Sequence, residues 1–282
     1  MSDRSLKVAA LRRRVARWVD PGLEAELRET RRRLKATRRR LRQAEGELRR
    51  SERPAPAAPV DALPEPVEHA IDRVRAERLT YVKADGLREL AAAVIALERD
   101  GVPGTIVEAG VARGGSAIVL AAAKAPERPL KLFDVFGMIP PPTEQDGPDV
   151  HRRYETIRSG QAAGPGGETY YGYRDDLLHE VRDAFTRHGF APESHSVDLV
   201  QGLFEDTIHL DGPVALAHLD GDWYESTRTC LTRIAPLLAP GGRLVIDDYY
   251  KWSGCRTAVD EYLAEPRGLR VEHRSKLHLV RD

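Results

Sequence analysis

Three carboxylates stand at the ends of two predicted strands. Asp220 ends an apolar strand predicted over 214–220, and Asp247 and Asp248 end a second one predicted over 243–247. Neighbouring parallel strands would bring these side chains into one pocket, where like charges raise each other's pKa unless a cation neutralises them. Oxygen ligands without His/Cys ligand spacing favour a hard divalent ion, and we predict magnesium. Helix capping by Asp247 and Asp248, or their solvation, is the alternative.

A glycine-rich turn follows another predicted strand, over 105–111. It runs Glu108-Ala-Gly110-Val-Ala-Arg-Gly114-Gly-Ser116 and leads into a helix, at the strand end where open α/β sheets bind ligands. The spacing G-x-x-x-G-G argues against a dinucleotide site, but it permits close backbone approach to a smaller, nucleotide-like ligand. A turn that needs glycine for steric reasons alone is the alternative.

An acidic residue ends the next predicted strand, over 130–136. Asp134 lies 26 residues after Glu108. A carboxylate at this place can accept hydrogen bonds from both hydroxyls of a ribose, and we predict that role for Asp134. A helix cap or a solvated charge is the alternative.

The elements that position these residues alternate along the chain. This alternation predicts an α/β fold with a mostly parallel sheet. The expected helices cover 84–99, a segment after Gly115 and 225–238; the further expected strand covers 196–200. Short strands at 269–273 and 277–280 predict an antiparallel hairpin at one sheet edge, an ending unusual for a dinucleotide-binding fold.

The first 53 residues differ in charge from the rest. They hold 18 Lys+Arg and 8 Asp+Glu, a net charge of +10, although the whole chain has a formal charge of zero. Leucines in this basic segment follow a heptad spacing that predicts a coiled coil and a homo-oligomer: Leu23, Leu27, Leu34, Leu41 and Leu48. We therefore expect a coiled-coil arm over 1–53, a proline-rich linker with a lead-in helix over 54–78, and a catalytic domain over 79–282.

The basic charge of the arm suits an anionic membrane surface or an acidic polymer, and a solvated helix face is the alternative. Nucleic acid is disfavoured, because Trp18 is the arm's one aromatic residue for base stacking. The longest apolar run, Ala117–Ala123, is far shorter than the roughly 20 residues of a membrane span. Arginines at positions 12–17 interrupt any signal peptide, and Cys230 and Cys255 lack metal-ligand spacing, so we expect a cytoplasmic protein with reduced thiols.

Over most of 79–263 the sequence resembles the macrocin and mycinamicin type (TylF-like) of sugar O-methyltransferases. Six blocks in order carry the resemblance: Asp100-Gly-Val-Pro-Gly, Glu108-Ala-Gly-Val-Ala-Arg-Gly-Gly, Asp134-Val-Phe-Gly with Pro140-Pro-Pro, Gly202-Leu-Phe-Glu-Asp-Thr, Leu219-Asp-Gly-Asp-Trp-Tyr-Glu-Ser-Thr, and Ile246-Asp-Asp-Tyr with Gly254-Cys-Arg. Six ordered blocks are far more specific than any one of them.

The resemblance implies a class I, Rossmann-like methyltransferase fold with a seven-stranded sheet. It also implies magnesium-dependent transfer of a methyl group from S-adenosylmethionine to a sugar hydroxyl of a glycoside or glycan. Asp220, Asp247 and Asp248 would be the metal ligands, and Asp220 would also be the catalytic base. The expected cofactor contacts are Glu108, Gly110, Gly114, Ser116 and Asp134, and Tyr224 and Glu225 would help to shape the pocket.

Two features depart from the family pattern, and both bear on the acceptor. Ala112 stands where a bulky aromatic residue is expected, and the segment 146–169 has no match. We expect the irregular, tyrosine-rich stretch 137–187 to form an acceptor lid rather than core elements; a disordered insert is the alternative.

Two other functions remain open. A catechol-type O-methyltransferase also binds two adjacent hydroxyls at a cation, and a coiled-coil assembly protein would keep the fold without catalysis. If the enzyme is active, the arm suggests work on a long glycan or in a biosynthetic complex near a membrane.

Overall fold

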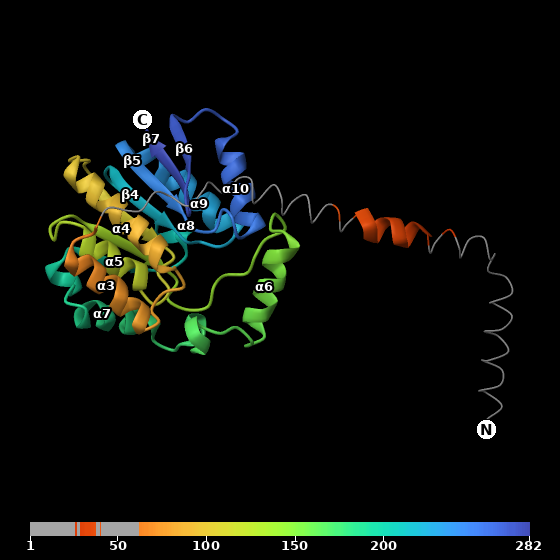
Figure 1. Cartoon of the computed structure of the whole chain (residues 1–282), viewed down its shortest axis with the longest axis horizontal. Coiled ribbons are helices and arrows are strands. Elements are labelled where there is room, and N and C mark those ends of the chain that lie inside the picture. Colours follow the sequence, from red (N-terminus) through yellow and green to blue (C-terminus); the bar gives the residue numbers. More distant parts are fainter. Residues whose placement is uncertain (1–25, 27–28, 38–39, 41–61) are drawn as a thin grey trace, which may run out of the picture. The chain divides into compact units, whose positions relative to one another are not determined.

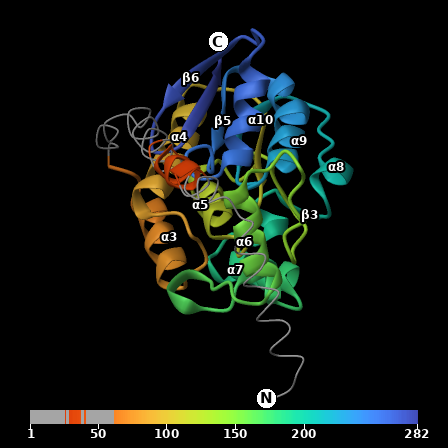
Figure 2. The same cartoon turned by 90° about the vertical axis from the view of Figure 1, so that its right-hand side faces the viewer.

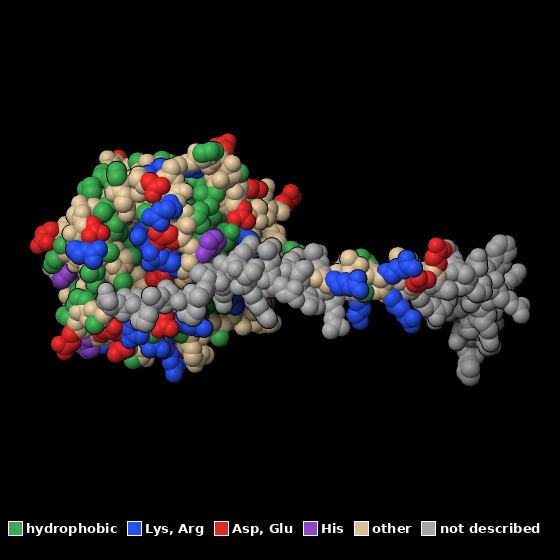
Figure 3. Space-filling model, turned by 45° about the horizontal axis from the view of Figure 1, so that its top comes forward, with side chains coloured by type: hydrophobic (Ala, Val, Ile, Leu, Met, Phe, Trp, Pro, Cys, Tyr) green, Lys and Arg blue, Asp and Glu red, His purple; other side chains and the backbone are tan. Residues whose placement is uncertain are grey.

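The computed structural model describes residue 26, residues 29–37, residue 40 and residues 62–282, and the chain divides into the units 1–53 and 54–282. In the first unit, residues 29–37 are helical and exposed, and Leu34 keeps 50% of its surface accessible. Exposed basic side chains line this helix, as Figure 3 shows: Arg31, Arg32, Arg33 and Lys35. The other heptad leucines lie outside the described residues, so the coiled coil stays a prediction.

The second unit is built on a seven-stranded sheet with the strand order β3-β2-β1-β4-β5-β7-β6. The strands are β1 (Thr105–Ala109), β2 (Leu130–Asp134), β3 (Val197–Gln201), β4 (Val214–Leu219), β5 (Leu238–Ile246), β6 (Leu269–His273) and β7 (Leu277–Arg281). Strands β1 to β5 are parallel, whereas β7 pairs antiparallel with both β5 and β6. The predicted mostly parallel sheet and its hairpin at one edge are confirmed.

Helices cover both faces of this sheet (Figures 1 and 2). One face carries α3 (Glu65–Ala76), α4 (Ala84–Arg99), α5 (Gly115–Ala123) and α7 (Leu177–Arg187), which share one apolar core. The other face carries α8 (Phe204–Thr207), α9 (Tyr224–Ile234) and α10 (Ser253–Leu263), which share a second core. Alternate strand residues feed the two cores, as Ile106 and Val107 do in β1, because successive side chains point to opposite faces.

The stretch 137–187 is more ordered than the sequence suggests. It contains α6 (Pro148–Arg158), the 3₁₀ turns η1 (Pro165–Gly167) and η2 (Tyr171–Tyr173), and α7. The expectation that this stretch lacks core elements is wrong for α7, because Leu177, Val181 and Ala184 recur at helical spacing and enter the main core. Helix α6 packs instead in a small separate cluster: Ile139, Val150, Ile157, Tyr170 and Trp223.

The remaining helices refine the expected boundaries. Helix α3 buries Val67, Ile71 and Val74 in the same core as α4 and α5, so this lead-in helix packs within the second unit. The helix expected over 225–238 ends at Ile234, and the 3₁₀ turn η4 (Ala235–Leu237) follows with a proline in its first turn. A further 3₁₀ turn, η3 (Pro192–Ser194), precedes β3. Among the described residues, we find no helix with the length and apolarity of a membrane span.

Candidate active site

The ends of β1 and β4 meet where a glycine removes a side chain. Gly110 follows β1 with a φ of +96°, and a Cβ atom there would lie 2.0 Å from the carbonyl oxygen of Asp220. The Asp220 amide donates to the Ala109 carbonyl at 2.8 Å. Only glycine permits both this backbone conformation and this contact. The glycine-rich turn is therefore directly adjacent to the first of the predicted metal ligands.

Asp134, at the end of β2, binds the backbone of the glycine-rich turn. Its Oδ2 accepts hydrogen bonds from the amides of Val111 and Ala112 at 2.7 and 2.9 Å, and its Oδ1 accepts one from Phe136 at 2.7 Å. Burial raises the pKa of Asp134, and the three amides oppose this effect. A carboxylate oxygen can accept more than one hydrogen bond, so Oδ1 retains capacity for a ligand hydroxyl.

Helix α5 begins at the end of this turn, and its first residue packs against another segment, because the Gly115 amide donates to the Leu79 carbonyl at 3.1 Å. Gly114 precedes it in the left-handed conformation, with no side-chain cap and no acidic residue in the first turn. Ser116 lies buried in that first turn. Uncapped amides at a helix start attract anionic groups, so the turn and α5 fit a nucleotide-like cofactor that carries a carboxylate.

A buried chain of charged side chains crosses the sheet beside this turn. Glu108 of β1 is aligned with His218 of β4, and its Oε1 lies 2.7 Å from Nδ1 of His218. The Nε2 atom of His218 lies 3.4 Å from Oδ1 of Asp247, and Oδ2 of Asp247 lies 2.6 Å from Nζ of Lys276. Burial opposes the charged imidazole, but hydrogen bonds to Asp247 and Glu108 raise the pKa of His218 to about 9. Glu108, an expected cofactor contact, thus uses its Oε1 atom to bind His218 within the protein interior.

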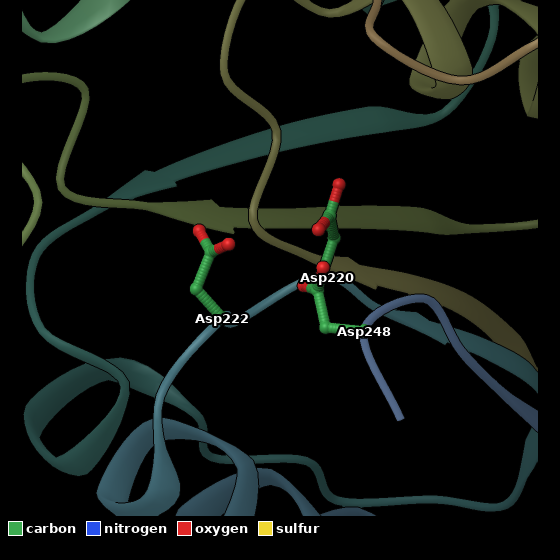
Figure 4. A group of neighbouring side chains, drawn as sticks. All are labelled: Asp220, Asp222 and Asp248. Atoms are coloured by element: carbon green, nitrogen blue, oxygen red, sulfur yellow. The ribbon is translucent and has the colours of Figure 1, made fainter. Parts of the chain in front are cut away.

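Three other carboxylates form a cluster at the ends of β4 and β5. Oxygen atoms of Asp220, Asp222 and Asp248 all lie within 4.8 Å of one another. Figure 4 shows the Asp248 carboxyl group directed at Asp220, with Asp222 beside them. Asp248 is buried, and its Oδ2 has no hydrogen-bond partner in the part of the chain that the structure describes.

The electrostatics of this cluster favour a cation. Burial and the charges of Asp247 and Asp248 raise the pKa of Asp220 well above its usual value. Burial and Asp248 raise the pKa of Asp222 to about 7. A divalent ion would relieve this repulsion and would use the buried Oδ2 of Asp248, so the donor set fits magnesium.

The structure brings together two of the three predicted ligands, Asp220 and Asp248. Asp247, just beyond the end of β5, instead contacts His218 of β4 and Lys276 of the turn between β6 and β7. Asp222 is the third carboxylate of the cluster. It is not among the metal ligands predicted from the sequence, although the motif Asp220-Gly-Asp222 places the two carboxylates only two positions apart. The φ of +57° at Asp222 turns the chain back on itself beyond the strand end.

Tyrosine rings from two segments of the chain pack together. The ring of Tyr171 lies 6.4 Å from that of Tyr81 and 4.3 Å from that of Tyr170. Tyr224 and Glu225, expected to help shape the pocket, have other partners. The Tyr224 hydroxyl donates to Glu261 at 2.6 Å, and Glu225 pairs with Arg228 on the exposed side of α9.

The strand order, with an antiparallel strand inserted next to the edge, defines a class I methyltransferase-like α/β fold. Residues 66–271 match the Macrocin-O-methyltransferase (TylF) family, and the chain belongs to that family. The resemblance seen in the sequence is therefore confirmed.

Curated relatives and a solved structure agree with this membership. The chain is 36% identical over 186 residues to the 8-demethyl-8-(2,3-dimethoxy-alpha-L-rhamnosyl)-tetracenomycin-C 4'-O-methyltransferase of Streptomyces olivaceus. This match covers 64% of the present chain and 64% of the relative. It is 32% identical to the mycinamicin III 3''-O-methyltransferase of Micromonospora griseorubida, over 65% of this chain and 69% of the relative. The structure of the O-methyltransferase NovP matches 74% of this chain and 88% of its own, with 26% identity and a TM-score of 0.58. The match thus spans less than two thirds of the tetracenomycin relative.

Proposed function

We propose that this chain is an O-methyltransferase that uses S-adenosylmethionine and magnesium to methylate a sugar hydroxyl of a glycosylated natural product. The observation that carries the proposal is the contact of Gly110 with Asp220, which sets a cofactor-type glycine turn against a carboxylate cluster. The acceptor class is suggested by the relatives, whose names specify a rhamnosyl tetracenomycin and mycinamicin III. A catechol-type acceptor is the second candidate within the same chemistry.

The cofactor would lie along the glycine-rich turn. We assign Gly110 and Gly114 to close backbone approach, Ser116 to a cofactor contact at the first turn of α5, and Oδ1 of Asp134 to a ribose hydroxyl. Glu108 would act through the oxygen that His218 leaves free, since Oε2 has no partner among the described residues. S-adenosylmethionine supplies a methyl group that is already activated for displacement, so the protein's task is alignment and proton removal.

The metal would be held by Asp220, Asp248 and Asp222. A bound divalent ion supplies charge that lowers the pKa of a coordinated hydroxyl. Asp247, the third ligand expected from sequence, is proposed to support the site through Lys276, or to join it if that ion pair opens. We assign proton removal to Asp220, because it is the carboxylate of the cluster that contacts the glycine-rich turn, along which the methyl donor would lie.

The acceptor would bind beside the tyrosines of η2. Tyr81 and Met138 keep 48% and 43% of their surfaces exposed. A Cβ atom added to Gly172 would lie 3.2 Å from Cα of Met138, so η2 packs directly against the backbone at Met138. Aromatic rings with polar edges suit sugar faces and hydroxyls, so we assign this surface to the glycoside.

The basic arm would hold several copies together through its heptad leucines and present them to an anionic partner such as a membrane surface or a biosynthetic complex. On the face of the second unit seen in Figure 3, basic and acidic side chains are mixed, so the arm is the better candidate for such contacts. Removal of residues 1–61 should therefore reduce the oligomer size measured by light scattering. Unchanged size would contradict this role.

Calorimetric titration of S-adenosylmethionine, followed by activity on glycosides, nucleotide sugars and catechols with magnesium or chelator, tests the function. Magnesium-dependent methylation of a glycoside is expected. A preference for catechols would move the chain to the second candidate. Failure to bind the cofactor would favour the non-catalytic assembly protein.

A further inference from the structure

The segment 140–149, which runs from the loop after β2 into the first turn of α6, lies against the starts of two helices. Helix α9 begins directly after the loop that carries Asp220 and Asp222, and α10 begins shortly after Asp248. The N-cap residues of these helices are Trp223 and Trp252, and neither provides a side-chain cap. The first amides of both helices therefore need acceptors from elsewhere.

Asp146 supplies such an acceptor to α9. Its Oδ1 accepts a hydrogen bond from the Tyr224 amide at 2.9 Å, and its Oδ2 accepts one from the Thr143 amide at 2.9 Å. The side chain is buried, and a Cβ added to Gly254 would lie 1.9 Å from Oδ1. Asp146 therefore sits between the first turns of α9 and α10, and the close contact requires glycine at position 254.

Asp149 supplies the corresponding acceptor to α10. The Ser253 amide donates to Oδ2 of Asp149 at 3.1 Å, and the Ser253 hydroxyl donates to Oδ1. A Cβ added to Gly147 would lie 2.2 Å from the Ser253 hydroxyl oxygen, so the segment is in close contact here as well. One short segment thus caps both helices from a distance in the sequence.

The two tryptophans connect this segment to the carboxylate cluster. The indole Nε1 of Trp223 donates to the Pro140 carbonyl at 3.0 Å, and its ring lies 5.8 Å from that of Trp252. The indole Nε1 of Trp252 donates to Oδ1 of Asp222 at 2.8 Å. Movement of the segment would therefore be transmitted to Asp222.

We propose that Asp146 and Asp149 are positioning residues that fix the distance between the two carboxylate-bearing loops and thereby set the affinity of the site for a divalent cation. The inference rests on the proposed function. The three carboxylates repel each other, and Lys251, whose Nζ lies 3.3 Å from Oδ1 of Asp248, pairs with that one carboxylate, so an external tie helps to hold the loops close before a divalent cation binds. Neither Asp146 nor Asp149 is a member of the cluster, and each acts through the helix that it caps.

Titration of Mg²⁺ into the full chain, followed by calorimetry and by tryptophan fluorescence, tests this role, because Trp252 contacts Asp222 directly. We expect Asp146→Ala and Asp149→Ala to weaken Mg²⁺ binding about fivefold to tenfold, as the loss of a helix cap predicts. Binding of S-adenosylmethionine should change less than about twofold, since the glycine-rich turn keeps its own contacts. A general structural defect would weaken both.

Ser253→Ala removes the hydroxyl that donates to Asp149 but keeps the backbone amide, so it should weaken Mg²⁺ binding less than Asp149→Ala does. The double variant should show less than the sum of the two effects. Glu155→Gln is the control, because Glu155 is exposed on α6 and its ion pair within the described residues is with Arg158, away from α9 and α10. If Asp146→Ala does not fold, Mg²⁺ titration of Asp149→Ala and Ser253→Ala still tests the inference, because both of these side chains are only half-buried. Unchanged Mg²⁺ affinity in the folded variants overturns the inference, whereas a wild-type chain that binds no Mg²⁺ overturns the proposed metal site first.

Discussion

Oδ2 of Asp247 lies 2.6 Å from Nζ of Lys276, and this ion pair turns Asp247 away from its sequence neighbour Asp248. Lys276 comes from the turn between β6 and β7, so the antiparallel hairpin at the end of the chain contributes a cation to the site. Asp248 faces Asp220 and Asp222 instead. Of these two adjacent carboxylates, Asp247 thus forms an ion pair and Asp248 is part of the carboxylate cluster.

The first prediction separates the ion pair from the cluster. Asp222→Asn should weaken Mg²⁺ binding about tenfold or more, because it removes a charged donor from the cluster. Asp247→Asn should weaken Mg²⁺ binding less and should lower the free energy of unfolding more, because it leaves His218 and Lys276 without their shared carboxylate. Calorimetry and urea unfolding give the two quantities. The reverse order would restore Asp247 as the third ligand.

The second prediction concerns pH and metal. Burial and Asp248 raise the pKa of Asp222 to about 7 from 3.8, so between these values the folded, metal-free chain holds a proton that the unfolded chain has lost. Its stability should therefore fall as pH rises toward 7. Mg²⁺ should bind more tightly at pH 8 than at pH 6 and should recover about 2.7 kcal/mol at a hundredfold excess over Kd. Thermal unfolding at both pH values, with Mg²⁺ or chelator, measures this. An Asp222→Asn chain should lose part of the difference, because burial and neighbouring carboxylates also raise the pKa of Asp220.

The third prediction concerns the buried imidazole. The pKa of His218 rises to about 9 from 6.5 despite burial, because Asp247 and Glu108 stabilise its charge. This stabilisation is complete below about pH 6.5 and is lost as pH rises through 9. We expect His218→Gln to cost on the order of 3 kcal/mol at pH 6, with a smaller cost at pH 9.5. Urea unfolding of both chains at each pH provides the comparison; an equal cost at the two values would show that the imidazole is uncharged.

The fourth prediction tests the contact between the turn and the cluster. Gly110→Ala places a methyl group against the Asp220 carbonyl at a positive φ, and we expect a loss of stability of about 2 kcal/mol or more together with weaker cofactor binding. Gly101→Ala is the control, because its φ is also positive but its Cβ would meet nothing within 4 Å. That variant should lose about 1 kcal/mol and keep its cofactor affinity. Equal losses would mean that conformation alone explains the glycine.

The fifth prediction separates cofactor binding from turnover. Asp134→Ala removes the acceptor for three amides of the glycine-rich turn and should weaken S-adenosylmethionine binding about tenfold or more. Asp220→Asn should abolish methyl transfer and leave cofactor affinity nearly unchanged. Cofactor titration and initial rates distinguish the two. If both variants behaved alike in both measurements, the assignment of these roles would be untenable.

Much of the fold and part of the site follow from sequence alone. Alternating apolar strands and amphipathic helices predict a parallel sheet, and the carboxyl ends of parallel strands meet at one edge. From the sequence alone, this rule predicts that four site residues lie at the same edge of the sheet: Gly110, Asp134, Asp220 and Asp248. It could do so because each residue lies at or just beyond a strand end, where local periodicity fixes its position.

Only the tertiary structure decided which partners these residues take. Asp146 meets Tyr224 across 78 positions and Asp149 meets Ser253 across 104, and no local pattern marks either pair. The same holds for Asp247, whose direction depends on a lysine from the final hairpin, and for α7, which enters the main core from a stretch that looks irregular. A sequence pattern specifies the side of an element on which a residue lies, but the charge or acceptor that it meets depends on the order in which distant elements pack.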